Sequence, residues 1–152
     1  IFSRLRMDLV VNILTAHAHK INKITVFGGE QFRPLIHVKD IAIAIEKVLE
    51  LNLNGVFNLH SVNTTGINIA ETVKNHFPNL VVETTGVKFQ DNRSYSVSSD
   101  KAKNQFNFNP KYTLDDGIKE IKNLLESGRI KDVFESNYSN VEHLKTSGEK
   151  FC

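Results

Sequence analysis

Apolar residues recur along this chain at two spacings, and the spacing switches repeatedly between that of a helix and that of a strand. Apolar side chains three or four residues apart predict amphipathic helices at about residues 6–20, 41–51, 68–77, 99–106 and 113–125. Short apolar and β-branched runs predict strands at 24–27, 34–38, 55–59 and 80–83. This alternation predicts an α/β domain. After Gly128 the pattern weakens, and residues 129–152 are expected to form a charged tail.

Polar residues with helix-capping chemistry mark where several of these helices begin. Asp40 precedes an apolar stripe, so we expect its carboxylate to cap that helix and its removal to cost about 1 kcal/mol of stability. Asn68 and Glu71 are spaced like a capping box, and so are Thr113 and Asp116. These signals predict helix starts near residues 40, 68 and 113.

Composition limits the class of protein. The chain has 152 residues, of which 40% are hydrophobic and 24% charged, as expected of one globular domain. Its 19 Lys and Arg residues against 17 Asp and Glu give a net charge of +2, and the basic residues are dispersed. We therefore expect no nucleic-acid partner. Apolar runs are too short to span a bilayer, so we expect no membrane partner either.

Cysteine and histidine usage is sparse. The single cysteine is Cys152, so a disulfide framework and a cysteine-based metal site within the chain are excluded, and a cytoplasmic location is favoured. The six histidines are scattered, and no metal site is expected. His37, on a predicted strand, is expected to be a packed side chain. Because the chain opens with Ile1 rather than Met, we interpret it as a fragment.

Five segments in a fixed order carry a family resemblance. The longest joins an Arg-containing loop to a buried strand and a helix, and the five lie at residues 4–12, 24–40, 56–59, 91–95 and 108–118. Together they resemble the C-terminal, substrate-binding half of the extended short-chain dehydrogenases/reductases, the NAD-dependent nucleotide-sugar epimerases and dehydratases. The resemblance implies the C-terminal part of a Rossmann-like fold, with short mixed strands and helices and without the Gly-rich half.

The same resemblance divides the chain into parts. It implies that residues 1–128 form the part that binds the nucleotide sugar. It also implies that residues 55–59 form a strand of a Rossmann sheet whose other strands are not in this sequence. Residues 129–152 remain the charged C-terminal tail.

Arg33 and Arg93 are the main candidate binding residues. A nucleotide sugar carries a diphosphate, and a planar guanidinium can bind phosphate oxygens through two parallel hydrogen bonds, which Lys cannot do. Taken by themselves, two Arg residues in polar loops are more often solvated or engaged in structural ion pairs. The family resemblance instead assigns both of them to the diphosphate.

The resemblance implies further substrate contacts at Asn12, Val26, Phe27, Gly28 and Tyr95. It places Asn12 near the substrate phosphates, Val26 to Gly28 against the nucleobase, and Tyr95 on the pocket wall. The alternatives from residue type alone are a tolerated polar residue within a helix for Asn12, a core strand and turn for 26–28, and a core aromatic for Tyr95.

Two motifs of the family are missing from the sequence. There is no Gly-rich turn between a strand and a helix, and no Tyr-x-x-x-Lys pair. No catalytic residue is therefore assigned, and the cofactor, NAD or NADP, is expected in the full-length protein and not on this fragment alone.

The resemblance leaves more than one function open. The leading hypothesis is a fragment of an NAD-dependent nucleotide-sugar epimerase or dehydratase that binds a nucleotide-diphosphate sugar. The alternatives are a non-catalytic binding or interaction remnant of that fold and a nucleotide-sugar keto reductase. A homodimer is plausible for the full-length protein, because the family dimerises through its Rossmann half.

Overall fold

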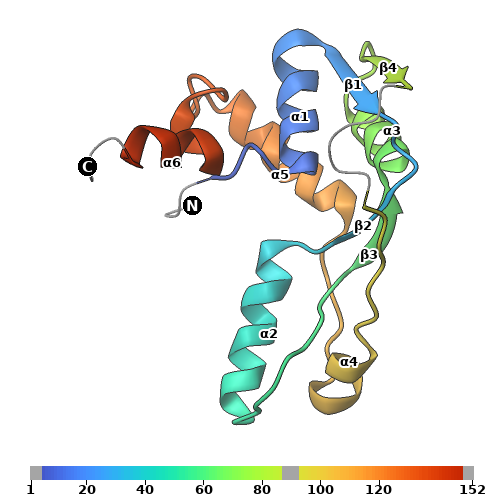
Figure 1. Cartoon of the computed structure of the whole chain (residues 1–152), viewed down its shortest axis with the longest axis vertical. Coiled ribbons are helices and arrows are strands. Elements are labelled where there is room, and N and C mark those ends of the chain that lie inside the picture. The colour runs from blue at the N-terminus through green and yellow to red at the C-terminus, as the bar shows by residue number, and fades with distance from the viewer. Residues whose placement is uncertain (1–4, 87–92, 149–152) are drawn as a thin grey trace.

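The computed structural model describes residues 5–86 and 93–148, which form an upper body and a lower arm (Figure 1). Helices predominate over short strands. The elements in chain order are α1 (Val10–Ile21), β1 (Lys23–Phe27), β2 (Phe32–Leu35), α2 (Val38–Glu50), β3 (Val62–Thr65), α3 (Gly66–His76), β4 (Val81–Thr85), α4 (Asp100–Phe106), α5 (Leu114–Glu126), the 3₁₀ turn η1 (Ser136–Tyr138) and α6 (Asn140–Gly148).

The upper body is built around a parallel pair of strands, β1 and β4, with Lys23 opposite Val81 at one end and Phe27 opposite Thr85 at the other. Helices α1, α3 and α5 pack together beside this pair. Their apolar faces and the inward residues of the strands share one core, whose buried members are Leu14, Ala18, Ile24, Val26, Ile69, Ala70, Val73, Leu80 and Ile118.

The lower arm contains α2 and α4 and has its own small core. Phe106 packs edge-on against Phe57 at 5.3 Å and lies 6.2 Å from Phe108. Ala44 and Ala102 complete the buried set, because small side chains let the two helices approach these rings. The arm is therefore folded, but only one face of α2 is covered.

The antiparallel pair β2–β3 joins the arm to the body, with Phe32 opposite Thr65 and Leu35 opposite Val62. Asp40, in the first turn of α2, provides a second connection. Its buried carboxylate accepts hydrogen bonds from the backbone N–H groups of Lys111 at 2.9 Å and Tyr112 at 3.2 Å.

The expectation that Asp40 caps its helix is therefore wrong. The N-cap of α2 is His37, whose Nδ1 accepts from Lys39 N at 3.2 Å. His37 is packed, as expected, with its ring stacked on Tyr112 at 4.8 Å. The carboxylate of Asp40 instead binds backbone that is 71 residues away, which no local pattern can reveal.

Other helix boundaries also differ from the sequence expectation. Helix α1 begins at Val10 rather than near residue 6. Helix α3 is capped by Thr65, whose hydroxyl accepts from Asn68 N at 3.3 Å, so the expected box of Asn68 with Glu71 is wrong. The Thr113–Asp116 capping box on α5 is confirmed.

The expected charged tail is partly folded. Ile130 and Val133 are buried with Met7, Leu124 and Leu125 in a third core. Residues 136–138 form η1, and α6 follows. Ile130 and Val133 lie among charged residues after Gly128, so the sequence pattern did not indicate that these two positions are buried.

Residues 55–59 form neither a helix nor a strand in this structure. The backbone of Phe57, Asn58 and Leu59 makes no hydrogen bond to other backbone groups of residues 5–86 and 93–148. A strand is defined by its pairing, so the expected strand is absent from the described sheets. Its assignment to a Rossmann sheet stays a prediction.

Candidate functional site

Arg33 and the segment 93–97 meet at the outer side of β2. The Arg33 guanidinium donates from Nη1 to the carbonyl oxygen of Arg93 and, at 2.9 Å, to that of Phe32. Tyr95 N donates to Phe32 O at 3.3 Å, and Phe32 N donates to Ser94 Oγ at 3.0 Å. Three of these hydrogen bonds hold the start of β2 against residues 93–95, which lie about 60 positions away in the sequence.

An aromatic ring completes this cluster. The Arg33 guanidinium carbon lies 5.5 Å from the centroid of the Tyr95 ring, in cation–π range. Tyr95 is half exposed and does not lie on a strand, so the alternative of a core aromatic is wrong. Arg93 lies on the exposed surface beside it. The arrangement presents positive charge, an aromatic face and nearby backbone on one surface.

The turn after β1 lies next to this cluster in sequence and requires glycine. Gly28 and Gly29 have φ of 68° and 85°. A Cβ on Gly29 would come within 2.6 Å of Val26 Cγ1 and 2.7 Å of Ile67 Cγ1. The Gln31 side chain then closes the turn by accepting from Gly29 N at 3.1 Å.

The three residues expected to contact the nucleobase fall in different environments. Val26 is buried in the core of the body, Phe27 is 42% exposed, and Gly28 donates from its N–H to Thr85 O at 3.0 Å. The side chain of Val26 therefore has a core role, while Phe27 and Gly28 are accessible at the strand end.

The structure does not bring Asn12 to this cluster by any contact among the described residues. Asn12 Nδ2 donates to Arg6 O at 2.7 Å, which holds the segment preceding α1 against that helix. That segment is further fixed by the Arg6–Asp8 ion pair at 2.6 Å, whose hydrogen bond lowers the pKa of the Asp8 carboxyl.

The turn at Gly28 and Gly29 differs from the Gly-rich turn of a dinucleotide-binding site. A dinucleotide pyrophosphate normally sits at the N-terminus of a helix that directly follows a Gly-rich turn. Here the Gly28–Gly29 turn leads into β2 instead, so its amides are not backed by a helix dipole. Among the described residues, no group of three or more His, Cys, Asp or Glu is arranged to hold a metal ion. No helix in that part is long and apolar enough to cross a membrane.

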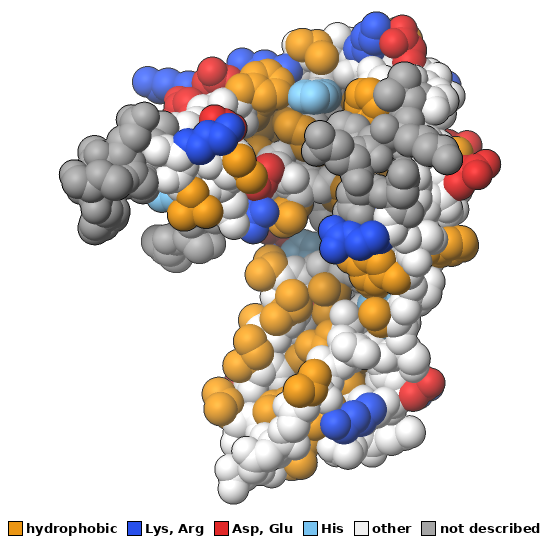
Figure 2. All heavy atoms as spheres, in the orientation of Figure 1, with side chains coloured by type: hydrophobic (Ala, Val, Ile, Leu, Met, Phe, Trp, Pro, Cys, Tyr) orange, Lys and Arg blue, Asp and Glu red, His pale blue; other side chains and the backbone are white. Residues whose placement is uncertain are grey.

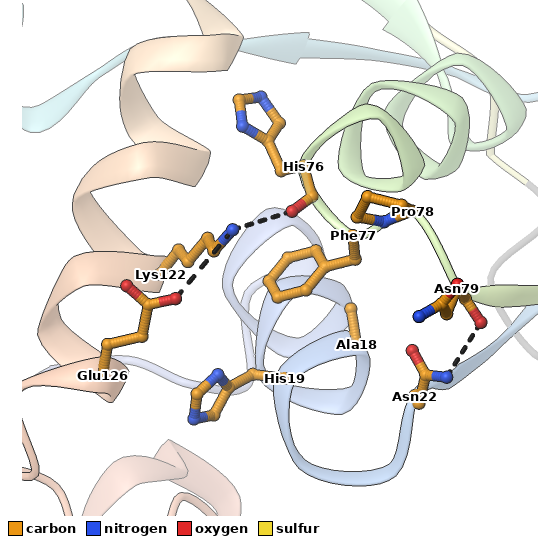
Figure 3. A pocket seen from close by; sticks show the side chains of 9 residues that line it. All are labelled: Ala18, His19, Asn22, His76, Phe77, Pro78, Asn79, Lys122 and Glu126. Atoms are coloured by element: carbon orange, nitrogen blue, oxygen red, sulfur yellow. Dashed lines mark hydrogen bonds and ion pairs between the residues drawn. The ribbon is translucent and has the colours of Figure 1, made fainter.

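A surface pocket lies elsewhere, where α1, α3 and α5 meet (Figure 3). The ammonium of Lys122 is its main charge, but it donates to His76 O at 2.8 Å and lies 3.9 Å from Glu126. His76 in turn contacts Asp115 at 2.8 Å. This pocket contains none of the residues that the sequence analysis selected, and its charges are paired internally.

Sequence reasoning missed two residues of the site. Ser94 supplies a hydroxyl to Phe32 N, and Asn63 on β3 binds the backbone of Val97. No pattern signalled Asn63, because residue 63 lies outside the strands predicted from the sequence and Asn is common in loops. No pattern signalled Ser94.

The structure was compared with those of known proteins. No protein-family model matches the sequence. The structure is similar to dTDP-glucose 4,6-dehydratase from Bacillus anthracis in complex with NAD, with a TM-score of 0.68 and 25% identity over 80% of this chain and 40% of that chain. It is also similar to UDP-glucose 4-epimerase from Thermotoga maritima with UDP-glucose, with a TM-score of 0.67 and 24% identity over 78% and 40%.

The same fold occurs in an enzyme with a different substrate. L-threonine dehydrogenase from Clostridium difficile matches with a TM-score of 0.66 and 20% identity, over 78% of this chain and 40% of that chain. The fold therefore does not determine the substrate.

The chain has the fold of one part of the Rossmann-like short-chain dehydrogenases/reductases, and it resembles their NAD-dependent nucleotide-sugar epimerases and dehydratases. It spans about 40% of the length of the structures reported above.

Proposed function

We propose that this chain is the nucleotide-sugar-binding part of an NAD-dependent epimerase or dehydratase, and that Arg33 and Arg93 bind the substrate diphosphate. The observation that carries the proposal is the cluster on β2. A hydrogen bond joins the Arg33 guanidinium to the backbone carbonyl of Arg93, so the segment that carries Arg93 and Tyr95 is held beside Arg33 before any ligand arrives.

Preorganisation is the physical reason why this arrangement favours an anion. A free Arg side chain loses about 2 kcal/mol of rotamer entropy when it is fixed on a ligand. Arg33 is already anchored through one nitrogen of its guanidinium, so less of this cost falls on binding. The exposed ring of Tyr95 offers a flat apolar surface beside the charge.

The uncovered face of the arm supports the assignment to one part of a larger fold. The outer face of α2 displays apolar side chains along its length (Figure 2), and the exposed ones include Val38, Ile45 and Leu49. Val56, in the unpaired segment 55–59, is 82% exposed. We propose that this surface packs against the part of the fold that the matched structures have in addition, and that 55–59 pairs there as a strand.

Catalysis and cofactor binding belong to that other part in this proposal. It would hold NAD and supply the groups that move protons during hydride transfer, while this chain orients the sugar by its diphosphate. The region of the gene upstream of Ile1 tests this directly. A Gly-rich strand-to-helix turn together with a Tyr-x-x-x-Lys pair is expected there, and the lack of both would favour a non-catalytic remnant. If both are present, a keto reductase remains an alternative that a substrate assay would separate.

Binding of a nucleoside diphosphate tests the role of the two arginines. We expect the 152-residue chain to bind UDP or dTDP in calorimetry, and Arg33→Leu or Arg93→Leu to weaken that binding. A charged hydrogen bond contributes about 1.5–3 kcal/mol, so each loss corresponds to roughly tenfold or more in affinity. Arg33→Lys should recover only part of the loss, because an ammonium cannot form the two parallel bonds.

Arg129 provides the matched control. It is an exposed Arg outside the cluster, so Arg129→Leu should leave the affinity unchanged. Thermal unfolding of every variant checks that the fold is retained. Equal affinities of the wild type, both cluster variants and the control would contradict the proposed role, as would the failure of the wild-type chain to bind either nucleotide.

A further inference from the structure

One side chain fastens the candidate binding segment to the sheet. The carboxamide of Asn63 donates from Nδ2 to Val97 O at 3.0 Å and accepts from Val97 N at Oδ1, also at 3.0 Å. Both hydrogen bonds are partly buried. A planar amide that satisfies the N–H and the C=O of a single residue reproduces what a neighbouring strand would supply.

Strand β2 explains why a side chain, rather than backbone pairing, attaches Val97 to the sheet. Phe32 uses its N–H and C=O toward residues 94 and 95, on the side away from β3. Backbone groups alternate in direction along a strand, so Pro34 faces the same side as Phe32. Proline has no N–H to donate. The backbone pairing that starts at Phe32 therefore loses its donor at Pro34, and Asn63, which is opposite Pro34 in the register, binds Val97 instead.

The consequences reach the proposed anion site. Segment 93–97 carries Arg93 and Tyr95 and supplies the carbonyl to which Arg33 donates. At its start it is fixed by the bonds to Phe32, and at its end by Asn63. Among the described residues, loss of the second attachment would leave the segment held at residues 93–95 and, beyond its end, at Ser99, whose Oγ binds His60.

We infer that Asn63 is a positioning residue for nucleoside-diphosphate binding, which it promotes by locking segment 93–97 in the conformation that gathers Arg33, Arg93 and Tyr95. This inference rests on the proposed function, because it concerns the same site. Asn63 itself need not touch the ligand. It raises the fraction of molecules in which the binding site is assembled.

Three variants of the 152-residue chain test the inference with UDP as the probe. Asn63→Ala removes both hydrogen bonds and should weaken UDP binding by about tenfold, because two neutral hydrogen bonds bias a local equilibrium by at least that factor. Amide hydrogen exchange at Val97 should accelerate by a similar factor, while exchange at the core residues Ile69 and Val73 stays slow.

Ser61→Ala is the matched control. The Ser61 hydroxyl donates to Leu35 O at 2.9 Å, so its loss removes a partly buried side-chain hydrogen bond from the same pair of strands without touching segment 93–97. The control should lower the melting temperature by less than Asn63→Ala does, because it removes one hydrogen bond rather than two and Leu35 O keeps the N–H of Ser61. Its UDP affinity and its Val97 exchange should match those of the wild type.

Asn63→Asp separates positioning from a general structural role by its pH profile. An ionised carboxylate cannot donate to Val97 O, whereas a protonated carboxylic acid can both donate and accept as the amide does. Relative to the wild type at each pH, UDP affinity of this variant should therefore recover as the pH falls from about 6 to about 4, through the ordinary range of an Asp. The Ala variant should show no such recovery.

The outcomes distinguish this inference from the proposed function. If the wild type binds UDP and Arg33→Leu abolishes binding, but Asn63→Ala binds like the wild type, the inference is overturned and the proposed function stands. If Ser61→Ala weakens binding as much as Asn63→Ala, the effect is general destabilisation and the inference is again overturned. If the wild type binds no nucleoside diphosphate, both fall.

Discussion

At the scale of single residues, polar side chains in this protein often bind backbone far away in the sequence. Asn63 binds Val97, Ser94 binds Phe32, and Asp40 binds Lys111 and Tyr112. Each satisfies backbone groups that make no hydrogen bond within a helix or between paired strands. The sequence identifies such residues as polar, but it cannot identify partners that the fold brings from dozens of positions away.

His17 gives the pH dependence that can be assigned to one residue. It lies on α1 with its ring 5.3 Å from that of Phe134, and burial lowers its pKa from the ordinary value of 6.5. A histidine whose pKa is lowered by folding binds its proton more tightly in the unfolded chain. Stability is therefore lost as the pH falls below about 6.5.

We expect the melting temperature of the wild type to fall more between about pH 7.5 and about pH 5.5 than that of His17→Gln, which cannot titrate there. Thermal unfolding followed by circular dichroism at both pH values measures the difference. Other titrating groups are common to the two proteins and cancel in the comparison. Identical pH dependence in both would show that the burial of His17 does not perturb its proton affinity.

At the scale of helices and strands, local signals predicted some termini and failed at others. The capping box of α5 was correct, because Thr113 and Asp116 are three residues apart and need no other part of the chain. Asp40 does not cap α2, because its carboxylate binds other backbone groups. It receives two backbone N–H groups in a buried position and so connects α2 to the loop before α5.

Replacement of Asp40 tests this connection. Asp40→Ala leaves two N–H groups of the loop without their acceptor, so we expect a loss of roughly 2–5 kcal/mol in the free energy of unfolding rather than the cost of a cap. Asp40→Asn keeps one acceptor oxygen and should lose less. Chemical denaturation monitors both variants.

Asp100→Ala is the control for the interaction of an acidic side chain with the helix dipole. Asp100 too is an acidic residue in the first turn of its helix, but it is exposed, so Asp100→Ala should cost about 1 kcal/mol or less. Equal losses for Asp40→Ala and Asp100→Ala would contradict the connecting role.

At the scale of the whole molecule, the arm leaves α2 apolar on the side away from its own core (Figure 2). Leu49 is 74% exposed, and Ile45 and Val38 are also exposed. A contiguous apolar surface of this kind is usually covered by another part of a protein or by a partner. The proposal that the rest of a Rossmann fold covers it accounts for both this face and the unpaired segment 55–59.

The double variant Ile45→Lys and Leu49→Lys tests the role of this face. Both side chains are exposed, so we expect a change within about 0.5 kcal/mol in the stability of the isolated chain. If the chain self-associates at high concentration, the variant should do so less, because charge opposes apolar association. Sedimentation velocity compares it with Leu144→Lys, an equally exposed position on α6 that should have no effect. A reduction only in the α6 variant would place the associating surface elsewhere.

The sequence by itself determined the α/β class and most helix and strand positions, which follow from periodicity and residue type, both of them local properties. The assignment of Arg33 and Arg93 to a diphosphate came from the family resemblance and stays a prediction. Even so, local patterns missed the folded part of the C-terminal region, because Ile130 and Val133 lie among charged residues and become core only against Met7 and α5.

Only the tertiary structure decided which of the selected residues lie together. In the structure Arg33 contacts Arg93 and Tyr95, whereas Asn12 binds Arg6. Asn63 attaches segment 93–97 to the sheet. The physical reason is that hydrogen bonds and charge act over a few ångströms in space. The spacing of residues in a sequence fixes such distances within a helix or a strand, whereas contacts across dozens of positions depend on how the elements pack.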